Sequence, residues 1–97
     1  MTVYIINNLM IRDRDEYLGY VRRFVPVFQK YGGTVLAAQD APEPVEGCWP
    51  YDRTVLLSFP SREAAERWTR SPEYLDITRK RRSSTVSNII ILDALPR

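Results

Sequence analysis

The sequence predicts an α+β fold with a four-stranded antiparallel sheet, and three observations lead to this prediction. The chain has 97 residues, a length that suits one domain and leaves too little for two independent cores. Its hydrophobic content of 44% is ordinary for a folded globule. Short β-branched and apolar runs alternate with segments whose apolar residues recur every three or four positions, which is typical of strands alternating with helices.

The N-terminal third of the chain predicts a strand followed by a long helix. The segment from Val3 to Ile11 is rich in β-branched and apolar residues and is expected to be a strand. A helix is expected from Asp13 or Arg14 to Tyr31, because its apolar residues fall three and four apart on one face. These residues are Tyr17, Val21, Phe24, Phe28 and Tyr31. Pro26 is expected to kink or interrupt this helix, which Gly32 and Gly33 then end.

Two further strands are expected from Thr34 to Ala38 and from Arg53 to Phe59. The segment between them, Gln39 to Asp52, contains several prolines, which predicts an ordered or semi-rigid loop rather than a domain boundary.

The C-terminal third predicts a broken helix and a last strand. Ser61 is a natural N-cap for a helix through Arg70, and Ser71-Pro72-Glu73 is a second helix start. The second helix is expected to run to about Arg82, and Val86 to Leu92 forms the last strand. The resulting order, βαββαβ, is the ferredoxin-like arrangement, expected to form a single domain over residues 1–97.

A lone subunit of this fold has too few helices to cover its sheet. Both helices pack on one face, yet the strands carry consecutive apolar residues, such as Ile89-Ile90-Ile91-Leu92, which make both faces apolar. Exposed apolar patches of this size mark interfaces. We therefore expect a homodimer in which two sheets pair through their bare faces as a dimeric α/β barrel. The alternative is that helix residues or the proline-rich loop cover that face.

Composition excludes several classes of function. The chain has no histidine, which removes the commonest general base and metal ligand, and its lone Cys48 forms no internal disulfide or zinc cluster. We expect no metal and no cofactor. The net charge of +2 comes from 14 basic and 12 acidic residues, so it gives no case for nucleic acid or membrane binding. No signal peptide or membrane-length apolar run is evident, which predicts a cytoplasmic protein.

The most suggestive group of polar residues is Glu46, Trp49 and Arg53, in and beside the proline-rich loop. Arg53 is a candidate to bind an anionic or carbonyl ligand, and Glu46 is a candidate for proton transfer, with Trp49 as an apolar wall. The alternative is a structural ion pair between Glu46 and Arg53 that fixes the loop, with Gly47 supplying a turn.

Aromatic residues give further candidates for a cavity between helices and sheet. Tyr17, Tyr20, Trp68 and Tyr74 each combine an apolar body with a polar tip, which suits a core position and a ligand pocket equally. Tyr20 lies off the main apolar stripe and is the best hydroxyl donor among them. Asn7 and Asn8 interrupt an apolar strand, so one of them faces inward, where it binds a ligand or satisfies loop backbone.

The only strong charge run is Arg79-Lys80-Arg81-Arg82. On a helix these residues point in different directions, and they lie near the C-terminal end, where the helix dipole favours cations. We interpret the run as a solvated helix end and expect no nucleic-acid partner.

The sequence resembles the bacterial domain of unknown function 1330 family, part of the dimeric α/β-barrel superfamily. The motifs that carry the resemblance are Glu46-Gly47, Phe59-Pro60-Ser61, Trp68 and Ser71-Pro72-Glu73-Tyr74, in this order and spacing. The resemblance implies the dimeric barrel fold and supplies no reaction. Two positions depart from the family pattern: Ser58 replaces a frequent glutamate, and Thr69 replaces a common aromatic.

Three functional hypotheses follow. The leading one is a small-molecule-binding or accessory protein of small-molecule metabolism whose barrel holds a partly apolar organic ligand. The second is a cofactor-independent enzyme, monooxygenase- or isomerase-like by analogy with the superfamily, with Glu46, Arg53 and Tyr20 as catalytic candidates. Under both of these hypotheses, the residues expected to bind the ligand are Trp49, Arg53, Tyr17, Tyr20, Trp68 and Asn7. The third is an interaction module whose cavity is filled by its own side chains.

Overall fold

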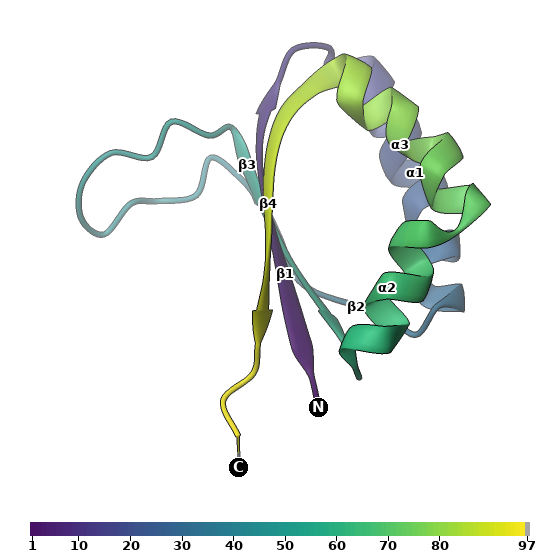
Figure 1. The fold of residues 1–97 in the computed structure, drawn as a ribbon. Helices are drawn as coiled ribbons and strands as arrows, with labels where there is room; N and C mark the ends of the chain where they lie inside the picture. Colours follow the sequence, from purple (N-terminus) through teal and green to yellow (C-terminus); the bar gives the residue numbers. More distant parts are fainter. Residues whose placement is uncertain (97) are drawn as a thin grey trace.

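In a computed structural model, which describes residues 1–96, a four-stranded antiparallel sheet is covered on one face by three helices (Figure 1). The elements in chain order are β1 (Val3–Ile11), α1 (Arg14–Lys30), β2 (Thr34–Asp40), β3 (Arg53–Phe59), α2 (Arg62–Arg70), α3 (Pro72–Ser84) and β4 (Thr85–Asp93). The strand order is β2-β3-β1-β4, so β1 and β3 are central. The predicted ferredoxin-like α+β fold is confirmed.

Helix α1 begins at an Asp13 N-cap, whose carboxylate accepts a hydrogen bond of 3.1 Å from the Glu16 amide. It continues through Pro26 to Lys30, so of the two expected effects of this proline, a kink or an interruption, the interruption is wrong. Proline removes only one backbone hydrogen bond, and the aromatic side chains on the buried face of α1 hold the helix against the sheet.

The buried face of α1 includes Tyr20, which the predicted stripe left out, while Val21 and Tyr31 of that stripe are only partly buried. Its buried residues are Tyr17, Tyr20, Phe24 and Phe28, so Tyr20 lies on the stripe and not beside it. Tyr20 follows Tyr17 by three residues, which at 3.6 residues per turn leaves the two side chains on the same face.

Serine caps join the last two helices. Ser61 Oγ accepts a 3.1 Å hydrogen bond from the Ala64 amide at the start of α2. Ser71 Oγ donates to the Trp68 carbonyl at 2.7 Å and accepts from the Tyr74 amide at 3.1 Å, so one hydroxyl ends α2 and begins α3. Both caps agree with the sequence prediction.

The sheet has two apolar faces, of which only one is covered by helices. On the helix-facing side, side chains such as Ile5, Leu57 and Phe59 are buried. Their neighbours along each strand point to the opposite side because strand side chains alternate. We call that side the bare face; its apolar residues on β3, β1 and β4 include Tyr4, Ile6, Met10, Leu56, Val86, Ile90 and Leu92.

The bare face keeps much of its apolar surface exposed. Ile90 is 52% and Leu92 45% exposed, and no helix lies on this side of the sheet among the described residues (Figure 1). The long loop between β2 and β3 projects from this side (Figure 1) and covers only the polar end of the face. There Trp49 Nε1 donates to Thr54 Oγ1 at 3.3 Å, and Asn88 Nδ2 donates to the Tyr51 hydroxyl at 2.9 Å.

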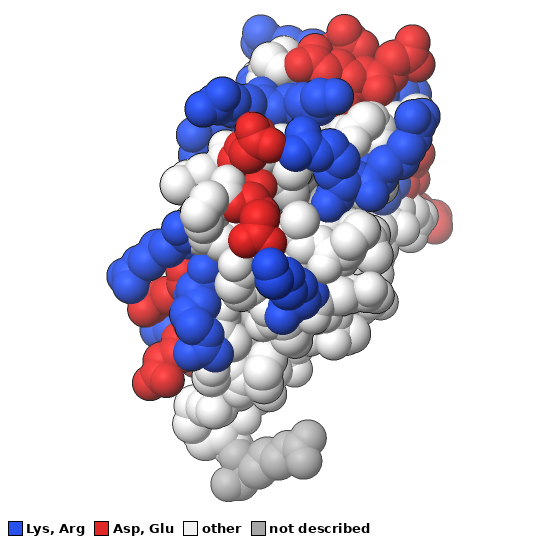
Figure 2. All heavy atoms as spheres, turned by 90° about the vertical axis from the view of Figure 1, so that its right-hand side faces the viewer, with Lys and Arg blue, Asp and Glu red and all other residues white. Residues whose placement is uncertain are grey.

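The outer surface of the helix layer carries many charged residues of both signs (Figure 2). Ion pairs join α1 to α3, with Arg23 to Asp76 at 2.6 Å and Lys30 to Glu73 at 2.9 Å. This surface is typical of a solvated face, in contrast to the bare face of the sheet. Over residues 1–96, no helix is long and apolar enough to cross a membrane.

Candidate functional site

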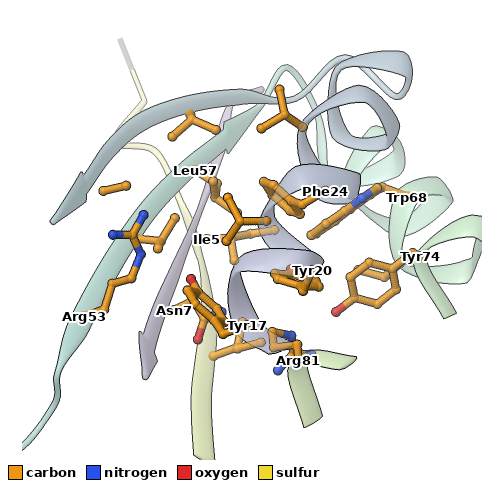
Figure 3. Close-up of a pocket in the computed structure, with 17 residues that line it drawn as sticks. Ile5, Asn7, Tyr17, Tyr20, Phe24, Arg53, Leu57, Trp68, Tyr74 and Arg81 are labelled. Atoms are coloured by element: carbon orange, nitrogen blue, oxygen red, sulfur yellow. The ribbon is translucent and has the colours of Figure 1, made fainter. Parts of the chain in front are cut away.

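A cavity of about 150 Å³ lies between the helices and the helix-facing side of the sheet (Figure 3). Its walls come from every secondary-structure element. The lining residues are Ile5, Asn7, Tyr17, Tyr20, Val21, Phe24, Val25, Val35, Ala38, Arg53, Val55, Leu57, Trp68, Thr69, Tyr74, Arg81 and Ile89. The described core is therefore hollow, which counts against the hypothesis of a cavity filled by its own side chains.

The floor of the cavity follows from the strand register. Ala38, Val55, Asn7 and Ile89 form one row across β2, β3, β1 and β4, because each pairs with the next. A bulge in β2 lies between Val35 and Ala37 and puts Val35 and Ala38 on the same side of the strand. Val35 is 42% exposed, so the cavity opens toward the β2 edge of the sheet.

Aromatic rings form the wall opposite the sheet. Phe24 packs edge-on against Trp68 with ring centroids 5.9 Å apart, and Trp68 packs on Tyr74 at 4.4 Å. Tyr20 lies 5.6 Å from Phe24 on α1. These contacts present a continuous apolar and aromatic surface to anything in the cavity.

Arg53 lies at the β3 end of the cavity and is paired with an acidic residue. Its Nη1 donates to Asp40 Oδ1 at 3.1 Å, and its guanidinium lies 6.0 Å from the Tyr17 ring centroid. Burial acts to lower the pKa of Arg53, but the hydrogen bonds to Asp40 and Tyr17 outweigh it and raise that pKa. The proposed ion pair between Glu46 and Arg53 is thus replaced by one between Asp40 and Arg53.

Arg81 enters the cavity from α3 and is the most buried charged group of the site. It is only 5% exposed, although the sequence suggested a solvated helix end. The run of basic residues diverges around the helix as expected, but Arg81 lies on the buried stripe with Ile77, Thr78 and Ser84. The ion pairs of the described residues involve Arg14, Arg23, Lys30, Arg53, Arg62 and Arg70, and none involves Arg81.

Tyr20 lies beside Arg81 and Tyr74 in the cavity (Figure 3). Burial raises the pKa of the Tyr20 hydroxyl well above its usual value, while the positive charge of Arg81 acts in the opposite direction. Burial likewise raises the pKa of Tyr17, with Arg53 opposing it. Both phenols therefore stay protonated at neutral pH and remain available as hydrogen-bond donors.

Three buried polar atoms of the cavity residues have no hydrogen-bond partner within the described chain. They are Asn7 Oδ1, Arg53 Nε and Trp68 Nε1. Asn7 is the inward-facing member of the asparagine pair, whereas Asn8 lies on the bare face and accepts a 3.0 Å hydrogen bond from Thr54. Buried polar groups are normally paired, so these atoms make the cavity suited to a molecule that supplies hydrogen-bond partners.

Glu46 and Trp49 are not at this site in the subunit. Glu46 lies exposed in the β2–β3 loop, and neither residue lines the cavity. The reason is strand alternation: Trp49 bonds to Thr54, which faces the side opposite its neighbour Arg53. The expected grouping of Glu46, Trp49 and Arg53 is therefore wrong, while Tyr17, Tyr20, Trp68, Arg53 and Asn7 do come together around the cavity.

The sequence interpretation missed Arg81, although a signal was present. An α-helix has 3.6 residues per turn, so Arg81, four residues after Ile77, lies on the same face of α3 as Ile77. The burial of this one arginine could therefore have been inferred from the sequence. Thr69, one of the two departures from the family pattern, also lines the cavity, whereas Ser58 does not.

The fold and its cavity define an α+β protein of the ferredoxin-like class. The chain belongs to the family described as "Domain of unknown function (DUF1330)", which it matches over residues 2–95. No curated protein sequence matches it.

Three solved structures show the same fold. A protein of unknown function from Rhodopseudomonas palustris is 24% identical with a TM-score of 0.81, the match covering 99% of this chain and 84% of that one. A dimeric ferredoxin-like protein of unknown function from a Jannaschia species is 12% identical, with a TM-score of 0.77 and coverage of 97% and 100%. SnoaB, a cofactor-independent oxygenase from Streptomyces nogalater, is 14% identical, with a TM-score of 0.74 and coverage of 99% and 95%. At these identities the likeness concerns the fold alone.

Proposed function

We propose that the protein is a homodimer that binds a small, partly apolar organic molecule in the cavity of each subunit. The observation that carries this proposal is a cavity of about 150 Å³ that is mostly apolar and aromatic, yet contains unpartnered buried polar atoms. Apolar cavities of about this volume accommodate a molecule the size of benzene. Convergent polar groups in an apolar pocket are typical of small-molecule sites.

The cavity supports binding better than it supports proton-transfer catalysis. None of the residues that line it in the described chain is Asp, Glu or His. Glu46, the candidate base, is exposed in the loop on the other side of the sheet. A cofactor-independent enzyme is the second candidate, suggested by the fold of SnoaB, and it would have to use Tyr20 and Arg53 without a carboxylate in the cavity.

Dimerisation is supported by the chemistry of the bare face. Ile90 and Leu92 are 52% and 45% exposed and are continuous with Ile6 and Leu56 across the sheet. A second copy of the chain supplies a surface of the same kind, which suits an isologous interface. The ferredoxin-like protein from Jannaschia is described as dimeric, which agrees with this arrangement.

The binding proposal is tested with a neutral apolar probe, toluene, observed by NMR in the presence of the purified protein. Ala38 lies on the edge strand and lines the cavity, so Ala38→Phe places a ring in the space that toluene would occupy. We expect toluene to bind the unmodified protein and not Ala38→Phe. The matched change Ala37→Phe, whose partner Leu56 lies on the bare face, is expected to retain binding. Equal binding to both variants, or none to the unmodified protein, would overturn the proposal.

A further inference from the structure

Resting on the proposed function, we infer that the ligand of the cavity carries a carboxylate, which Arg81 binds, on a body about the size of a single ring. The inference names the chemical class of the ligand: a compact, mostly apolar monocarboxylate. It stands on the burial of Arg81, on the absence of a carboxylate beside it among residues 1–96, and on the size and lining of the cavity.

Arg81 carries a buried positive charge that pairs with no acidic residue of the described chain. A buried guanidinium is costly unless a carboxylate or another acceptor compensates it. Arg53 has such a partner, because Asp40 lies 3.1 Å from its Nη1. Arg81 is more buried, at 5% exposed, and forms no ion pair in the described chain. The cavity thus holds one compensated and one uncompensated cation, and its lining carries no acidic residue to balance the second.

The cavity also contains hydrogen-bond donors that no acceptor of the described chain pairs with. Arg53 Nε and Trp68 Nε1 are buried donors without an acceptor in the described residues. Tyr20 remains protonated and adds a third donor beside Arg81. A site rich in unused donors is complementary to a ligand that brings acceptors, and a carboxylate brings two oxygens in the plane that matches a guanidinium.

The aromatic wall and the volume of the cavity limit the rest of the ligand. Phe24, Trp68 and Tyr74 form an aromatic wall, and the volume of about 150 Å³ limits the ligand to about one ring and a substituent. Asn7 Oδ1 in the floor is an unpartnered acceptor, so a ligand hydroxyl would be accommodated there. Long-chain acids and polyanions do not fit this combination of size and apolar lining.

Isothermal titration calorimetry on the 97-residue chain measures the affinities of benzoate and of its neutral isostere benzamide. We expect benzoate to bind more tightly than benzamide to the unmodified protein. Arg81→Met is expected to weaken benzoate binding at least about tenfold and to weaken benzamide binding much less, because the bidentate ion pair with the guanidinium is lost only for the anion. The control is Arg82→Met, the exposed neighbour on α3, which is expected to leave both affinities unchanged.

A thermal denaturation readout separates a ligand-binding arginine from a structural one. If the partner of Arg81 is a ligand anion, Arg81→Met removes an uncompensated buried charge from the ligand-free protein and raises its Tm. A structural arginine would lower it. If Arg81→Met fails to fold, Arg81→Lys takes its place, and benzoate alone is expected to weaken because the planar fork is lost.

The outcomes distinguish this inference from the proposed function. Equal affinities for benzoate and benzamide, an Arg81→Met variant that binds benzoate as before, or no binding of benzoate at all would each overturn the carboxylate assignment. Toluene binding that is lost in Ala38→Phe would leave the proposed function standing in all three cases.

Discussion

Asn7 is a polar residue in an apolar row, between Val55 and Ile89 on the neighbouring strands. Its Oδ1 atom is buried without a hydrogen-bond partner in the described chain, which costs folding free energy. We predict that Asn7→Leu raises the free energy of unfolding of the ligand-free protein by about 1 kcal/mol. Urea denaturation followed by circular dichroism measures this change.

The matched control for Asn7 is its neighbour Asn8. Asn8 Oδ1 accepts a 3.0 Å hydrogen bond from Thr54 on the bare face, so Asn8→Leu breaks an existing bond. No stabilisation is expected from it. If Asn7→Leu lost as much stability as Asn8→Leu, the Asn7 side chain would already have a hydrogen-bond partner within the protein. It would then not be available to bind a ligand.

At the residue scale, the sequence predicted which residues line the cavity better than it predicted which of them lie next to one another. Tyr17, Tyr20, Trp68 and Arg53 were all candidates, because aromatic and basic residues on a helix face or at a strand start are visible in the sequence. The separation of Trp49 from Arg53 depends on which side of the sheet the loop takes. Contacts between residues of the loop and the sheet, such as the hydrogen bond from Trp49 to Thr54, determine that side. No local sequence pattern predicts them.

At the scale of the elements, the connection between α1 and β2 is sterically constrained at Gly33. A Cβ atom added at Gly33 would clash with the outer ring atoms of Phe28, which is fully buried in the core. We predict that Gly33→Ala lowers the free energy of unfolding by about 1–3 kcal/mol, because the ring must move in a packed interior. Chemical denaturation at equilibrium measures this loss.

Gly19 provides the contrasting substitution in the same region. It lies inside α1, where the nearest atom to an added Cβ is the flexible Lys80 Nζ at 3.4 Å. Gly19→Ala is expected to stabilise the protein by about 0.5–1 kcal/mol through helix propensity. If both substitutions shifted the denaturation midpoint in the same direction, the packing explanation for Gly33 would be refuted.

Element type and order were predictable because each element carries its own local signal. Ser61 and Ser71 mark helix starts, and the apolar runs of β1 and β4 mark strands. The continuity of α1 through Pro26 was not predictable, because tertiary packing of its aromatic face outweighs the loss of one hydrogen bond. Arg81 was misplaced for a related reason: a basic run masks the burial of one of its members.

On the scale of the whole molecule, the bare face determines the assembly that we propose. We predict that Ile90→Lys, which puts a charge on the apolar face, shifts the protein from dimer to monomer. Sedimentation equilibrium measures the mass against 11.3 kDa for one chain. The control is Leu75→Lys on α3: Leu75 and Ile90 are both 52% exposed, but only Ile90 lies on the bare face. A dimer that persists in Ile90→Lys would place the interface elsewhere.

We propose that two copies of the chain pair through their bare faces and that each holds a ligand in the cavity between its own helices and sheet. Native mass spectrometry of the purified protein tests it most directly. The account predicts a species of twice 11.3 kDa that carries an additional small-molecule mass, and loss of that additional mass in Ala38→Phe with the dimer retained. A species at the mass of one chain, or an additional mass that Ala38→Phe leaves in place, would contradict it.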